Sequence, residues 1–121
     1  IRAMGPRVVV AKQGEYGAAL LTDDGFFGLP AYPLETVNDP TGAGDSFAGG
    51  FIGYLAAHGG EDLSHQTLCR AMAYGTAIAS FNVEEFGTER VRRLTRDEIT
   101  ERVAELQRIT HFVDAPIALR A

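Results

Sequence analysis

Asp45 is the residue of this sequence best placed to do chemistry, because it follows three small residues at the expected start of a helix. Gly42, Ala43 and Gly44 leave room for backbone N–H groups to approach a ligand closely. The first turn of the helix adds N–H donors without intrahelical partners and the positive end of the helix dipole. Together these donors predict an anion site suited to phosphate.

A carboxylate beside a phosphate site indicates phosphoryl transfer. In the first turn of a helix it interacts favourably with the dipole, by about 0.3–1 kcal/mol when exposed. The carboxylate of Asp45 can take the proton of an attacking hydroxyl while backbone donors stabilise charge on the transferring group. A site that only bound phosphate would gain nothing from an acid here, because like charges repel. The alternative is an ordinary strand-to-helix turn in which Asp45 only begins the helix.

Two familiar phosphate motifs do not match this segment. A Walker A loop requires Lys and then Ser or Thr after its last glycine, and here Asp45 follows Gly44. A dinucleotide-binding fingerprint requires a third glycine where this sequence has Phe47.

Composition narrows the class of partner. The 121 residues are 45% hydrophobic and 22% charged, with a net charge of -5, which is ordinary for one soluble globular domain. The acidic balance argues against a nucleic-acid partner and an anionic membrane surface, and no apolar run is long enough to span a bilayer. Cys69 is the only cysteine, which excludes an internal disulfide and fits a cytoplasmic location.

The expected elements are strands followed by helices, an α/β arrangement with no boundary that would divide the chain. Three strands are predicted, with a hairpin turn between the last two, over residues 7–12, 18–22 and 26–32. Three helices are predicted, over residues 44–58, from a cap at Ser64 to about residue 81, and after a capping box at Thr95. Residues 82–93 are predicted to be irregular. The segment 39–45 therefore joins an extended stretch to a helix.

The first of these helices contains three glycines, Gly49, Gly50 and Gly53. Each costs about 1 kcal/mol relative to alanine in a helix, so they predict that another part of the molecule passes close by. The apolar residues of the same helix recur at helical spacing and predict packing against a sheet.

The segment Asp39-Pro40-x-Gly42-Ala43-Gly44-Asp45-x-x-x-Gly49-Gly50-Phe51-Ile52 resembles the second signature of the ribokinase family of PfkB-type carbohydrate kinases. The resemblance extends over roughly residues 7–112 and is to the C-terminal part of that family's three-layer α/β/α domain, with the N-terminal half absent. It implies ATP-dependent phosphoryl transfer to a hydroxyl of a sugar or nucleoside, with Mg²⁺. It also implies that Asp45 is the catalytic base and that the backbone of residues 42–44 is the anion hole.

The resemblance implies further contacts with the nucleotide. The turn containing Lys12, Gly14 and Gly17 resembles the segment that lies against the ATP phosphates, although many members have threonine where Lys12 stands. Gly75 matches a position near adenine that is often asparagine, and glycine offers no side-chain amide there.

A cation site is implied by the same resemblance. Residues 83–87 resemble the loop that borders the adenine pocket and a monovalent-cation site. In some members of the family K⁺ is held by residues that match Asp39, Thr41 and Gly87.

The identity of the acceptor and the activity of the isolated chain depend on the N-terminal half of the family's domain, which the resemblance does not cover. The family's sugar-binding residues and magnesium motif belong to its N-terminal half, so these 121 residues alone are expected to bind nucleotide weakly and not to turn over. Two other interpretations stay open. One is a non-catalytic module whose uncovered apolar surface pairs with a partner or forms a homo-oligomer. The other is a nucleotide-binding regulatory domain.

Overall fold

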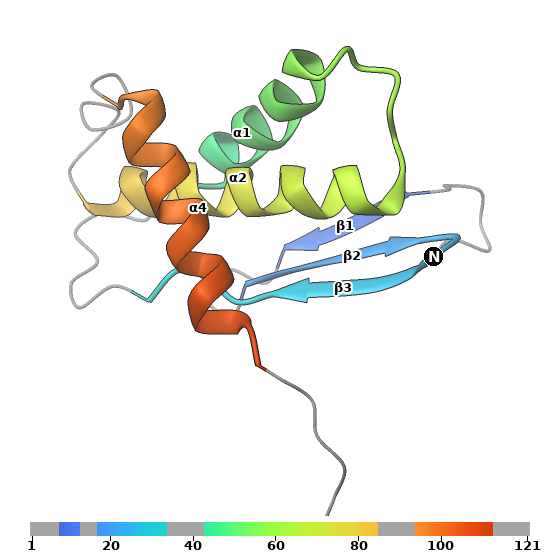
Figure 1. Cartoon of the computed structure of the whole chain (residues 1–121), viewed down its shortest axis with the longest axis horizontal. Coiled ribbons are helices and arrows are strands. Elements are labelled where there is room, and N and C mark those ends of the chain that lie inside the picture. Colours follow the sequence, from blue (N-terminus) through green and yellow to red (C-terminus); the bar gives the residue numbers. More distant parts are fainter. Residues whose placement is uncertain (1–7, 13–16, 34–42, 85–93, 113–121) are drawn as a thin grey trace, which may run out of the picture.

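A computed structural model describes residues 8–12, 17–33, 43–84 and 94–112 of the chain. In this part, α2 lies over one face of a three-stranded antiparallel sheet, α1 packs against α2, and α4 crosses the C-terminal half of α2 (Figure 1). In chain order the elements are β1 (Val9–Lys12), β2 (Ala18–Thr22), β3 (Gly25–Leu29), α1 (Ala43–Ala57), α2 (His65–Glu84) and α4 (Arg96–Thr110). The predicted α/β class and the order of strands before helices are confirmed. No helix in these ranges is long and apolar enough to span a membrane.

The strands agree closely with the sequence pattern. β2 has the predicted bounds, and the two-residue turn Asp23–Asp24 joins Thr22 to its partner Gly25, whose φ is 146°. β3 ends at Leu29, earlier than predicted, because Pro30 has no N–H to continue the hydrogen-bonded ladder.

The sheet has one face against the helices and one face without a cover among the described residues. On the inner face, Leu20 and Met72 of α2 are fully buried and belong to one core with Phe47 of α1. On the opposite face, Val9, Leu21 and Phe26 are aligned across the three strands. These three residues form what we term the outer row. Phe26 is 67% exposed and Leu21 37% exposed, so the row is apolar and accessible.

The contact between α1 and α2 depends on two glycines that face each other. A Cβ built at Gly50 would lie 3.0 Å from the Cα of Gly75, and one built at Gly75 would lie 2.8 Å from the carbonyl oxygen of Phe47. The predicted close approach to α1 is therefore confirmed at Gly50. At Gly49 and Gly53, by contrast, an added Cβ would meet no described atom within 4 Å apart from the neighbouring residues and backbone of α1 itself.

Both helix caps predicted from sequence are present. Ser64 Oγ accepts a hydrogen bond from Thr67 N at 3.3 Å, and Thr95 Oγ1 accepts one from Glu98 N at 3.2 Å. In the second case Glu98 Oε1 accepts from Thr95 N at 3.1 Å, which completes the capping box. At the first cap, Asp62 accepts from the Thr67 hydroxyl at 2.7 Å and from Ser64 N at 3.1 Å. These two hydrogen bonds, the one from Thr67 foremost, hold the pKa of Asp62 below its usual value of 3.8.

Gly75→Ala is expected to lower the free energy of unfolding by about 1–3 kcal/mol, because the added methyl group would force α1 and α2 apart. Gly53→Ala is the matched control, since the new methyl group meets open space and removes the cost of a helical glycine. Urea unfolding of both variants measures the difference. Equal midpoints for the two variants would contradict the assigned helix contact.

Asp62→Asn is expected to flatten the dependence of stability on pH in acid. The pKa of Asp62 is lowered on folding, so the ionised carboxylate stabilises the folded state at pH values above its unfolded pKa of 3.8. This stabilisation is lost as the pH falls through the lower pKa of the folded state. Chemical unfolding at several values between about pH 5 and pH 2 tests this. An identical loss of stability in acid for the variant and the parent would count against the cap.

Candidate functional site

Asp45 lies in the first turn of α1, with its side chain exposed. Of the residues predicted to surround it, Gly44 and the backbone of Ala43 are described, and Ala43 is the first residue of the helix. Several of the predicted site residues lie outside the described residues, namely Gly14, Asp39, Thr41, Gly42 and Gly87. The structure thus places the carboxylate at the positive end of the α1 dipole, where the sequence predicts it.

Lys12 joins the end of β1 to the start of α1. Side chains alternate between the two faces of a strand, so Lys12 points to the same face as the core residue Val10, toward the helices. Its Nζ donates a hydrogen bond to the carbonyl oxygen of Gly44 at 3.3 Å and lies 5.9 Å from the centroid of the Phe47 ring. The ammonium group therefore lies beside the first turn of α1, one residue from Asp45.

Gly44 leaves the space that the ammonium group occupies. A Cβ built at Gly44 would lie 2.9 Å from Lys12 Nζ, the one described atom within 4 Å apart from the neighbouring residues and backbone of α1 itself. The small residue expected to expose backbone donors also admits a cationic side chain. Within the described ranges, no hydrogen bond or ion pair joins Lys12 to Asp45, so both charges face solvent at the same helix end.

Gly17 and Gly75, both predicted from resemblance to contact the nucleotide, have structural reasons to be glycine. Gly17 has a φ of 106°, and a Cβ there would collide with the carbonyl oxygen of Leu29. Gly75 is buried where α2 meets α1 and contacts Phe47. Their contact with a nucleotide stays a prediction.

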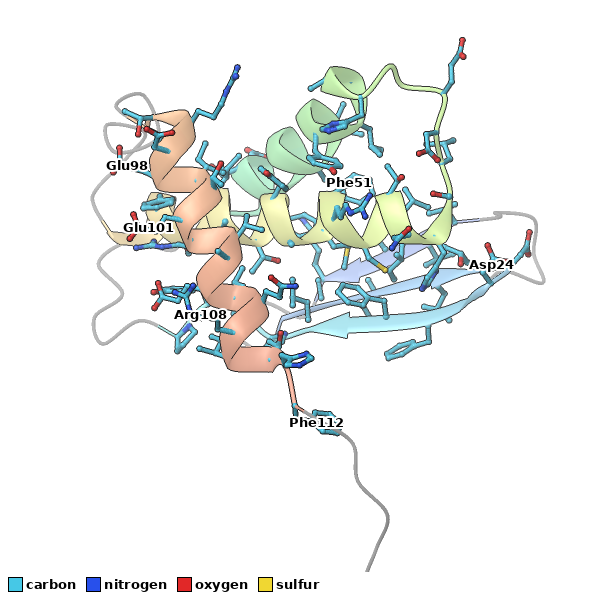
Figure 2. The ribbon with its side chains drawn as sticks, viewed as in Figure 1. Asp24, Phe51, Glu98, Glu101, Arg108 and Phe112 are labelled. Carbon is cyan, nitrogen blue, oxygen red and sulfur yellow. The ribbon has the colours of Figure 1, made fainter. Side chains whose placement is uncertain are left out.

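Phe47 lies between Lys12 of β1 and Gly75 of α2. The sequence predicts for it only a place on the apolar face of its helix. It is buried, its ring stacks at 6.2 Å on that of Phe51, and its backbone and ring lie against Gly75. Phe51 lies between α1 and α2 (Figure 2). The start of α1 is thus packed against α2 through Phe47 and contacted by Lys12 of β1.

The end of α2 differs from the prediction. Residues 82–93 are predicted to be irregular, whereas the helix continues to Glu84. The predicted cation loop thus begins as helix, and its remainder lies outside the described residues. Among the described residues, no three His, Cys, Asp or Glu side chains are grouped closely enough to hold a metal ion.

Arg102 on α4 is a second feature without a signal in the sequence, because it belongs to a mixed polar face. Its guanidinium lies against the rings of Tyr32 and Phe81. Glu98 and Glu101 project from the same helix (Figure 2).

Comparison with known proteins shows the family of the chain. Residues 1–93 match the pfkB family of carbohydrate kinases. The chain is 44% identical over 90 residues to a nucleoside kinase from Methanothermobacter thermautotrophicus, a match that covers 74% of this chain and 26% of that protein.

Solved structures extend the likeness to the fold. Aminoimidazole riboside kinase from Salmonella enterica, crystallised with aminoimidazole riboside and an ATP analog, superposes with a TM-score of 0.70 at 29% identity, over 85% of this chain and 33% of that chain. Ribokinase from Giardia lamblia superposes with a TM-score of 0.72 at 20% identity, over 86% and 35% of the two chains, and so supports the ribokinase fold alone. The chain spans about a third or less of the length of these relatives. It belongs to the pfkB family of carbohydrate kinases.

Proposed function

We propose that this chain is the catalytic and nucleotide-binding part of a kinase that transfers a phosphoryl group from ATP to a hydroxyl of a nucleoside or sugar. The observation that supports it most is an exposed carboxylate, Asp45, in the first turn of α1, within a chain of the pfkB family. In this proposal Asp45 is the general base, and the backbone N–H groups of Gly42, Ala43 and Gly44 form the anion hole.

The described residues fit a polyphosphate. The first turn of α1 offers backbone donors, Gly44 adds no side chain over them, and the ammonium group of Lys12 lies alongside. A single carboxylate beside these donors also fits Mg²⁺ bound to a nucleotide, because that ion keeps several waters and needs few protein ligands. K⁺ at Asp39, Thr41 and Gly87 remains an expectation from the family.

Each residue has a distinct part in the proposed reaction. ATP, when bound, supplies the phosphoryl group. Asp45 accepts the proton of the attacking hydroxyl, because it is exposed and no described side chain is bonded to it. The backbone donors at the start of α1 stabilise the negative charge that develops on the transferring group. Lys12 adds a positive charge at the flank of that turn.

The acceptor class is proposed from the relatives. Those most similar over this segment include nucleoside kinases, and one structure contains a riboside together with an ATP analog. A nucleoside hydroxyl is therefore the first acceptor to test, and a sugar hydroxyl the second. We propose that the residues that select the acceptor belong to the part of the relatives that this chain does not span.

Asp45→Asn, made in the full-length protein that contains this chain, is expected to lower kcat by about 10²–10⁴, the usual contribution of a general base. ATP affinity should change little, because the amide keeps the size of the carboxylate. Asp97→Asn is the matched control, since it removes a first-turn carboxylate from α4 instead of α1. Coupled-enzyme kinetics and calorimetry supply the two readouts. Full activity of Asp45→Asn would refute the base assignment.

Lys12→Met is expected to raise the Kd for ATP about tenfold, the effect of losing one hydrogen bond to a charged group. The Kd for adenosine should stay the same, because the lost contact is with phosphate. Gly44→Ala is a second variant, in which the new methyl group displaces the ammonium group while keeping its charge. Calorimetry with both ligands measures these effects. An unchanged ratio of the two Kd values in Lys12→Met would contradict a phosphate contact.

A further inference from the structure

Arg102 of α4 contacts two aromatic rings that come from separate parts of the chain. Its guanidinium carbon lies 3.6 Å from the ring centroid of Phe81, near the end of α2, and 4.4 Å from that of Tyr32, which follows β3. Its Nη1 donates a hydrogen bond to Ser80 Oγ at 2.9 Å. Phe81 and Ser80 are 3% and 5% exposed, so the guanidinium is fixed against a buried surface. We term Arg102 with Tyr32, Ser80 and Phe81 the arginine clamp.

The hydrogen bonding of Ser80 requires a donor at this position. The Ser80 hydroxyl donates its only hydrogen to the carbonyl oxygen of Ala77 at 2.6 Å, so its oxygen is left as an acceptor. Arg102 supplies the matching N–H. A planar guanidinium can stack on two rings and donate in its own plane at once, which a lysine ammonium group cannot do.

The surroundings of Arg102 argue against a ligand site. Glu98, Glu101 and Glu105 line, together with Phe81 and Arg102, a surface hollow of about 230 Å³. Among the described residues that line this hollow, three carboxylates outnumber one guanidinium, so these residues supply no net positive charge to attract a phosphate. The contacts of Arg102 are instead with other segments of the protein.

The segments that Arg102 contacts adjoin two described residues of the proposed nucleotide site, Gly17 and Gly75. Tyr32 follows β3, and the end of that strand lies against Gly17. Phe81 lies in the last turns of α2, the helix that also contains Gly75. Arg102 itself lies beyond residue 93, where the family match ends. One side chain outside the matched segment thus contacts two elements next to residues proposed to contact the nucleotide.

We propose that Arg102 is a positioning residue for nucleotide binding. It sets the placement of the exit from β3 relative to the end of α2, and with these two elements the placement of Gly17 and Gly75. The inference rests on the function proposed above, and it adds α4 to the parts of the molecule on which ATP affinity depends.

Arg102→Met in the full-length protein is expected to raise the KM for ATP about 3- to 10-fold, the size of effect seen for residues coupled to a site without touching it. The kcat at saturating ATP should change less than twofold, because Asp45 and α1 are not altered. Arg102→Lys should not restore the KM, since stacking and in-plane donation are both lost. Tyr32→Leu and Ser80→Ala each remove one contact, and each should give a smaller rise.

Leu106→Ala is the matched control for stability. Leu106 is 1% exposed on the same helix, and its truncation loosens α4 without removing a clamp contact. It should lower Tm at least as much as Arg102→Met while leaving the KM for ATP unchanged. The same KM in both variants, or full rescue by Arg102→Lys, would overturn the inference. If Arg102→Met fails to fold, unchanged KM values in both Tyr32→Leu and Ser80→Ala would overturn it. Failure of the parent protein to use ATP would instead refute the proposed function itself, and this inference with it.

Discussion

The close contact between α1 and α2 at Gly50 and Gly75 is the constraint on which the rest of this structure depends. Because neither residue has a side chain, the two helices approach until Gly75 touches the carbonyl of Phe47. That approach brings Phe47 into the same core as Leu20 of the sheet. The first turn of α1 thereby reaches the end of β1, where Lys12 can contact it. Loss of this contact would move the carboxylate on α1 away from the cation on β1.

Local patterns in the sequence are sufficient to predict the helices, strands and caps, but not the contacts between them. The hairpin and the caps at Ser64 and Thr95 follow from short-range rules, and all are present. The extension of α2 to Glu84 was missed, because the glycine-containing segment beyond it suggested an earlier end. The partner of Gly50 was unknown from sequence, since a helical glycine does not show what it faces. Arg102 had no signal at all, because aromatic partners so distant in sequence are defined only by the fold.

In the predicted site, too, the positions of residues follow from local patterns, whereas their contacts follow from the fold. Asp45 was placed correctly at the start of α1 because a glycine-rich segment before an apolar helix has few other structural outcomes. Gly17 and Gly75 are predicted from the resemblance to contact the nucleotide. The structure gives a separate reason for glycine at both positions, because a side chain there would collide with neighbouring backbone atoms. The nucleotide contact of Lys12 is implied by the resemblance alone and stays a prediction, whereas its contact with Gly44 follows from the alternation of side chains along β1. Membership of the family is the shared support for the roles proposed for these residues.

The outer row has a consequence for how this part of the molecule behaves in solution. Val9 belongs both to that row and to β1, which is an edge strand of the described sheet. An edge strand rich in β-branched residues, beside an apolar face, is a template for the addition of a further strand. Where nothing covers this surface, intermolecular sheet formation would compete with the native state as protein concentration rises. Salts such as sulfate, which strengthen apolar burial, would shift that competition toward aggregation.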